Sequence, residues 1–172
     1  MSQLHMMRSH LRDLPELELP AGVIARAGTP ADAVAVGRVI GLAFDDPSWT
    51  DEKVLGELLA NADVDETIVL EENGVIIATA SAKTLTDRPH VGYVHYVATD
   101  PGQARRRLGH RATLAVLHTF VRLGKTEAIL DTDDFRRPAI RVYRDLGFVP
   151  DMSKEGHPEL WATVDAEMES RP

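Results

Sequence analysis

The chain has 172 residues, of which 44% are hydrophobic and 27% charged, and its formal net charge is -8. This length fits one ordinary domain, and no apolar run approaches the roughly 20 residues of a membrane helix, so we expect a soluble, cytoplasmic protein. The absence of cysteine excludes disulfides, thiolate metal sites and a cysteine nucleophile. The first 20 residues contain no continuous apolar segment and no small-residue cleavage site, so no secretory signal is expected.

Positive charge is concentrated in one window of this acidic chain. Residues 104–144 contain ten Lys/Arg and four Asp/Glu, a net charge of +6, whereas the rest of the chain carries -14. A nucleic-acid-binding domain would show a broad basic face and a high pI, but the pI of this sequence is about 5.3. The pattern favours a compact ligand that carries phosphate groups, and it argues against nucleic acid as a partner.

The N-terminal residues 1–20 are expected to form a loosely tethered arm, in which Leu14, Leu17 and Leu19 could pin the last part to a sheet edge. Residues 21–172 are expected to form the domain. Its predicted elements, in chain order, are a strand at 23–26, helices at 29–44 and 50–61, strands at 66–72, 75–83 and 90–99, a helix at 108–123, a strand at 127–132, a helix at 138–147, and final strands at 147–150 and 160–164.

Local signals support several of these elements. Thr29 and Pro30 suit the N-cap and first position of a helix, and Asn73-Gly74 is the dipeptide that a tight hairpin turn favours. Gly124 follows a continuous helical stripe of apolar residues and is a good helix stop. The order of elements predicts a single α/β (α+β) domain, with a mixed central sheet of about 6–7 strands flanked by about four helices.

The stretch "TDPGQARRRLGHRATLAVL" (99–117) places four arginines where a strand ends and a helix begins. The first backbone N–H groups of a helix lack intrahelical partners and carry partial positive charge, so such a turn can hold an anion. Arg105, Arg106, Arg107 and Arg111 would add donors suited to a pyrophosphate. The alternative is a solvated surface, on which arginines oppose the helix dipole.

The segment "VHYVATDPGQARRRLGHRATLAVL" (94–117), followed by "AIRVYRDLGF" (139–148), resembles the GNAT superfamily of acyl-CoA-dependent N-acyltransferases. The resemblance covers about residues 24–150, including the order of elements. In that family a strand leads into an Arg/Gln-x-x-Gly-x-Gly/Ala turn that binds the coenzyme A pyrophosphate. This chain has Ala104 and Arg107 at the first two motif positions and keeps only Gly109, so Arg107 must adopt a backbone conformation usually left to glycine, or the turn is reshaped.

The resemblance implies acetyl-CoA as the acyl donor. No metal is expected, because the histidines other than His95 show no metal-ligand spacing with carboxylates. The strand before the turn would bind the pantetheine arm and the acyl carbonyl through backbone N–H groups. The residues expected to contact the cofactor are Val97, Ala98, Thr99, Arg105, Arg106, Arg107, Leu108, Gly109, His110 and Ala139.

Two residues are candidates for proton transfer. Tyr143 falls on the family's tyrosine, which acts as general acid toward the departing sulfur; its alternative role is a core aromatic beside Ala139 and Leu146. His95 falls where the arylalkylamine branch of the family carries a histidine that helps to deprotonate the amine, and a pKa near neutrality suits that task. The alternatives are that His95 has only a structural role, or that the amine loses its proton to a water molecule. Members of the family often carry an asparagine near residues 131–136 that touches the pantetheine arm, but the match does not assign that role to any of residues 131–134 or to Arg136.

The family plan places the amine acceptor beside the loop between the first two helices. Phe44, Asp45, Asp46 and Trp49 could there bind a cationic acceptor through charge and aromatic contact. Alternatively, Asp45, Asp46 and the following proline only form a turn, and Trp49 only covers a helix.

The sequence thus predicts an N-acetyltransferase that acts on a primary amine of a small molecule or peptide. A homodimer is a further expectation. The alternative is a non-catalytic acyl-CoA-binding or nucleotide-binding module.

Overall fold

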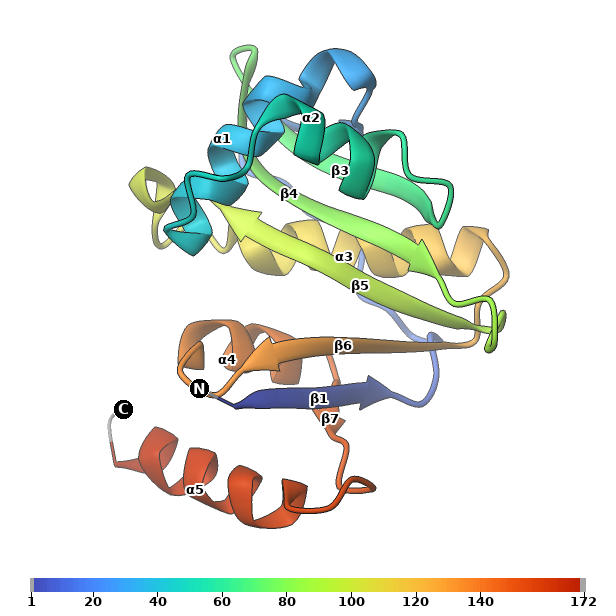
Figure 1. Cartoon of the computed structure of the whole chain (residues 1–172), viewed down its shortest axis with the longest axis vertical. Coiled ribbons are helices and arrows are strands. Elements are labelled where there is room, and N and C mark those ends of the chain that lie inside the picture. The colour runs from blue at the N-terminus through green and yellow to red at the C-terminus, as the bar shows by residue number, and fades with distance from the viewer. Residues whose placement is uncertain (1, 171–172) are drawn as a thin grey trace.

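The computed structural model describes residues 2–170. Residues 1, 171 and 172, which fall in the predicted arm and domain, lie outside this range. The described residues form one seven-stranded sheet in the order β2-β3-β4-β5-β6-β1-β7 (Figure 1). Its strands are β1 (Gln3–Arg8), β2 (Val23–Ala27), β3 (Val64–Glu72), β4 (Val75–Thr84), β5 (Val91–Thr99), β6 (Glu127–Asp133) and β7 (Val149–Pro150).

Five α-helices accompany the sheet within residues 2–170. They are α1 (Ala33–Phe44), α2 (Asp51–Val54), α3 (Leu108–Arg122), α4 (Arg137–Asp145) and α5 (His157–Glu169). A π-helical turn, Leu55–Leu59, continues α2, and short 3-10 turns at Pro30–Asp32 and Pro101–Gln103 precede α1 and α3. Strands β5 and β6 are parallel and the other neighbours are antiparallel, so the predicted mixed sheet and single α/β domain are confirmed.

Helices cover both faces of the sheet. Because side chains alternate along a strand, Ile68 and Leu70 of β3 enter the core that contains α3, α4 and α5, whereas Val69 enters a second core under α1. In Figure 1, α1 and α2 lie in front of β3 and β4, while α3 runs behind the sheet. Within residues 2–170, none of the helices combines the length and the apolar character that spanning a membrane requires.

The N-terminal residues differ from the expected arm. Residues 3–8 form β1, which lies inside the sheet between β6 and β7. Its alternating residues Leu4 and Met6 are almost fully buried. The following leucines, Leu14, Leu17 and Leu19, pack against the larger core, so the segment beyond β1 is also held to the domain.

The predicted strand at 160–164 is wrong, because these residues belong to α5. The buried residues of α5 are His157, Trp161 and Val164, a spacing of four and three that fits a helix. The aromatic and β-branched residues of "LWATV" favour a strand locally, but the helical spacing of buried residues over the whole of 157–169 decides for a helix. The sheet still has seven strands, because β1, which the sequence did not predict, pairs with β6 on the side away from β5.

Candidate active site

The two parallel strands at the centre of the sheet separate along their length. Strands β5 and β6 pair from Val91 with Glu127 to Val94 with Leu130, and the pairing ends there although both strands continue. Figure 1 shows their arrowheads pointing apart. The last residues of β5 therefore present backbone groups to an opening instead of to a neighbouring strand.

A bulge in β5 lies at this opening. Opposite β4, Thr79 pairs with Ala98 and Ser81 with His95, so Tyr96 and Val97 together stand against one residue of β4. Tyr96 has a positive φ of 46°, which is unfavourable for a bulky side chain and persists only where its surroundings hold it. The Tyr96 ring meets the Trp49 ring edge-on at 4.6 Å between centroids, so the side chain of this bulged residue is packed against the segment before α2.

The backbone direction after the bulge follows from one hydrogen bond. The Asp100 N–H donates to the Ile77 carbonyl of β4 over 2.9 Å. Successive N–H groups of a strand point to opposite sides, so the free N–H groups at this end of β5, beginning with that of Thr99, point away from β4 and into the opening. These are backbone donors that could bind a carbonyl or amide group.

A cavity of about 260 Å³ lies between the loop before α3 and the start of α4. Helix α3 begins at Leu108, so its first N–H groups face this loop and can bind an anion. Arg105 and Arg107 in the loop have φ values of 67° and 53°. The left-handed Arg107 confirms the expectation that this residue takes a conformation usually left to glycine.

The arginines of this loop have different surroundings. Arg106 makes a bidentate ion pair with Glu72 at the end of β3, with N···O distances of 2.7 and 2.9 Å. The hydrogen bonds raise the pKa of Arg106 and lower the pKa of Glu72, so both stay charged and tie the loop to β3. Arg105 is exposed and makes no ion pair within the described residues, which leaves its guanidinium available to a ligand.

A second cavity, of about 240 Å³, lies on the other side of the same opening. Its walls include Phe44 of α1, Tyr93 and His95 of β5, and Asp131 of β6. The two cavities share three lining residues, Val97, Ala139 and Tyr143. They therefore meet at the β5 bulge and the Tyr143 side chain.

Tyr143 stands at this junction on α4. It follows Ala139 by four residues, which puts both side chains on one face of the helix. Burial raises the pKa of the Tyr143 hydroxyl to about 12, so the group keeps its proton at neutral pH. A protonated hydroxyl between two cavities can donate a proton or a hydrogen bond to a group in either one.

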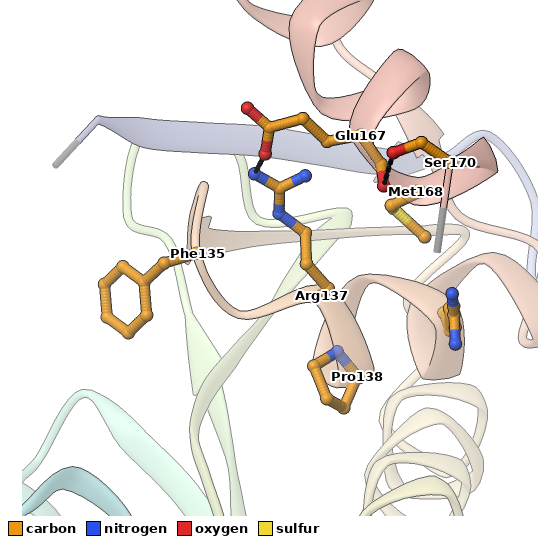
Figure 2. Close-up of a pocket in the computed structure, with 7 residues that line it drawn as sticks. Phe135, Arg137, Pro138, Glu167, Met168 and Ser170 are labelled. Carbon is orange, nitrogen blue, oxygen red and sulfur yellow. Dashed lines mark hydrogen bonds and ion pairs between the residues drawn. The ribbon is translucent and has the colours of Figure 1, made fainter. Parts of the chain in front are cut away.

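Contacts with α5 hold α4 in place. The Arg144 guanidinium lies 2.5 Å from the Asp165 carboxylate, and Arg137 is hydrogen-bonded to Glu167. Figure 2 shows Arg137 directed toward Glu167 at another cavity, of about 640 Å³, between the start of α4 and the end of α5. Pro138 lines both this cavity and the one beside α3, but none of the predicted site residues borders the larger cavity.

His95 is half-buried in the second cavity. Burial, together with repulsion from Lys83, lowers the pKa of its imidazole to about 4, and the Asp131 charge opposes this shift. The ring is therefore neutral at physiological pH and can accept a hydrogen bond. Such a low pKa differs from the near-neutral value expected from the sequence, because the strand position desolvates the ring.

Most of the predicted cofactor residues come together. The cavity beside α3 is lined by Val97, Thr99, Arg105, Arg106, Arg107, Leu108, Gly109 and Ala139. Ala98 instead faces the core under α1, and His110 is outside the lining. Sequence reasoning did not select Gln103, Ala104, Pro138 and Val142, which also line this cavity.

The predicted acceptor residues are divided between two places. Phe44 lines the cavity that contains His95, whereas Asp45, Asp46 and Trp49 line a separate hollow beside α1. The cavity that contains His95 also has lining residues that the sequence did not reveal, among them Gln3, Tyr93, Tyr96 and Asp133. No three His, Asp or Glu side chains among residues 2–170 are grouped so that they could hold a metal ion.

Comparisons with known proteins agree with this architecture. The chain is 33% identical over 160 residues to mycothiol acetyltransferase of Mycobacteroides abscessus, an alignment that covers 85% of this chain and 52% of the relative. The chain thus spans about half the length of the curated relatives that it matches. Its fold is similar to a GCN5-related N-acetyltransferase from Sphaerobacter thermophilus, with a TM-score of 0.70, 22% identity, and coverage of 87% of this chain and 48% of that one.

A further structural relative was solved with a ligand. The PaiA N-acetyltransferase of Thermoplasma acidophilum, in complex with coenzyme A, has a TM-score of 0.67 and 14% identity, and the match covers 78% of this chain and 94% of that one. The profile of the Acetyltransferase (GNAT) family matches residues 37–148, which contain β5, the arginine loop, α3 and Tyr143. The chain belongs to the GNAT acetyltransferase family.

Proposed function

We propose that this protein transfers an acetyl group from acetyl-CoA to a primary amine by direct attack. The observation that carries the proposal is the meeting of two cavities at Val97, Ala139 and Tyr143. One cavity has the helix N-terminus and arginines that suit a pyrophosphate, and the other has room for an acceptor. A thioester whose carbonyl lies at the junction would be reachable by an amine from the acceptor side.

The residues at the junction suit the requirements of the reaction. The N–H groups of Val97 and Thr99 would stabilise the negative charge that develops on the carbonyl oxygen. As the amine nitrogen forms its bond to the carbonyl carbon, the carbon–sulfur bond breaks, and the sulfur must gain the proton that Tyr143 can donate. The nitrogen loses one proton, which His95 or a water molecule in the acceptor cavity would accept.

The proposed acceptor is a primary amine whose identity is not specified further. The relative from Mycobacteroides abscessus is named a mycothiol acetyltransferase, so the amine that such enzymes acetylate belongs in the first test panel. Small diamines, amino sugars and a lysine peptide complete it. We further propose that the protein acts in the cytoplasm, where acetyl-CoA is available. That two copies of the chain form a homodimer stays a prediction.

The test is release of free thiol from acetyl-CoA in the presence of each amine, for wild type and Tyr143→Phe. Wild type should release thiol and acetylate at least one amine. Tyr143→Phe should lower kcat by about 10²-fold or more with little change in acetyl-CoA affinity, because the ring stays packed while the proton donor is lost. Equal kcat values would reassign Tyr143 to the core, and binding of acetyl-CoA without turnover of any amine would favour the non-catalytic module.

A further inference from the structure

We propose that Asp131 binds a second hydrogen-bond-donating group of the acceptor, a hydroxyl or an ammonium, and that His5 of the N-terminal strand positions the Asp131 carboxylate for this contact. The inference rests on the proposed acetyl transfer and adds a substrate class to it. It concerns a side-chain network that reaches from β5 across β6 and β1 to the loop before α5.

Three neighbouring strands build this network. His5 of β1 and Asp131 of β6 are direct partners across the sheet, and the His5 Nδ1 atom is hydrogen-bonded to Asp131 Oδ1. The Tyr93 hydroxyl of β5 donates to Asp131 Oδ2 over 3.2 Å. Burial and the Asp131 charge raise the pKa of Tyr93, so Tyr93 stays protonated and remains a donor. One hydrogen bond thus holds each oxygen of the carboxylate.

The far side of His5 fixes its tautomer. Lys154 Nζ lies 2.6 Å from His5 Nε2. An ammonium can only donate, so Nε2 must accept and the ring proton belongs on Nδ1, from which it is donated to Asp131. The His157 ring stacks on His5 with 5.0 Å between centroids and 12° between planes, which fixes the orientation of the imidazole. His5 Nδ1 is therefore a donor aimed at Asp131.

Asp131 differs from the other carboxylate of the acceptor cavity. Asp133 is neutralised by Arg136, whose Nε lies 3.1 Å from Asp133 Oδ2. Asp131 has no lysine or arginine partner within residues 2–170, and Tyr93 and His5 donate one hydrogen bond each to its carboxylate. A carboxylate offers about four lone-pair sites, so two remain for a ligand.

The position of Asp131 indicates which part of an acceptor would reach it. Asp131 lines the acceptor cavity and not the cavity beside α3, whereas Val97 and Tyr143 line both. The reacting amine belongs at the shared junction, so a group at Asp131 must be a different part of the same molecule. The fixed carboxylate therefore selects amines that carry a second donor, such as diamines, amino alcohols or amino sugars.

The experiment compares matched amines with and without the second donor, using kcat/KM for acetyl transfer. Wild type should prefer the amine with the second donor, and Asp131→Asn should reduce this preference by about 10-fold or more, the usual effect of losing a hydrogen bond to a charged group. The loss should fall mainly on KM for the amine, with unchanged affinity for acetyl-CoA. A diamine and an amino alcohol of equal length distinguish the ammonium from the hydroxyl as the bound group.

His5 is tested as a positioning residue. His5→Leu should reduce the same preference, whereas His5→Asn should restore part of it, because the Asn amide nitrogen can donate in place of Nδ1. Asp87→Asn, an exposed carboxylate in the loop between β4 and β5, is the matched control and should change nothing. If wild type acetylates amines but Asp131→Asn keeps the full preference, this inference is wrong. If wild type acetylates none of the amines, the proposed function itself fails.

Discussion

The imidazole of His95 shows how its strand position changes a titratable group. Burial and the Lys83 charge lower its pKa to about 4, while Asp131 acts in the opposite direction. We expect the His95 ring, followed by NMR, to titrate near pH 4 instead of near the ordinary value of about 6.5. Lys83→Met should raise this pKa because it removes a repelling charge, and Asp131→Asn should lower it because it removes an attracting one. A wild-type value near 6.5 would contradict the described burial.

The loop arginines predict two separable effects. Arg105→Ala should weaken coenzyme A binding at low salt with little change in stability, and the difference should shrink as salt screens the charge. Arg106→Ala should instead lower the midpoint of thermal unfolding, because it breaks the cross-link to Glu72. Calorimetric titration at two salt concentrations and thermal unfolding of both variants measure these effects. Weaker binding of coenzyme A by Arg106→Ala at unchanged stability would show that Arg106 contacts the ligand.

At the residue scale, the sequence predicted groups that belong to a continuous motif. The sequence could single out Val97, Gly109 and Tyr143 because they stand at fixed distances along the chain, and the structure places them along two cavities that meet. His5 and Asp131 are 126 residues apart, and only the register of β1 against β6 brings them together. No local pattern in the sequence contains that register.

Strand β5 packs against α3 through a glycine. A Cβ atom at Gly92 would lie 2.5 Å from atoms of the Phe120 ring, which is fully buried. Gly92→Ala should therefore lower the free energy of unfolding by about 1–3 kcal/mol, the usual effect of overpacking a core. Urea unfolding checks this. Gly56→Ala is the control: apart from its chain neighbours and the backbone of its own helix, no atom lies within 4 Å of the added Cβ, so the stability of this variant should stay level or rise slightly. Equal stability of the two variants would contradict the close packing of β5 on α3.

At the element scale, local signals succeeded where the local preference and the final packing agree. The Asn73-Gly74 hairpin formed as predicted, with positive φ at both residues, because the turn is specified by two adjacent residues. The segment at 160–164 failed because five residues are too few to distinguish a strand from one side of a helix. Strand β1 was missed because its only signal, the alternation of Leu4 and Met6, is very short.

The whole molecule depends on its N-terminal strand. Leu4 is completely buried, so Leu4→Ala should lower the free energy of unfolding by about 2–5 kcal/mol, as expected for a large core side chain. Glu18→Ala, on the exposed side of the following segment, should change it by no more than about 0.5 kcal/mol. Chemical denaturation of both variants makes the comparison. A loosely tethered arm would instead give small and similar effects for the two substitutions.

The central claim is that the opening between β5 and β6 binds acetyl-CoA beside Tyr143. Calorimetric titration of acetyl-CoA into wild type and Ala139→Trp tests it most directly, because Ala139 lines both cavities at their junction. We predict one binding site per chain in wild type and loss of binding in Ala139→Trp. The control Ala162→Trp, on the exposed face of α5, should bind like wild type. Absence of binding to wild type, or unchanged affinity in a folded Ala139→Trp, would contradict the claim.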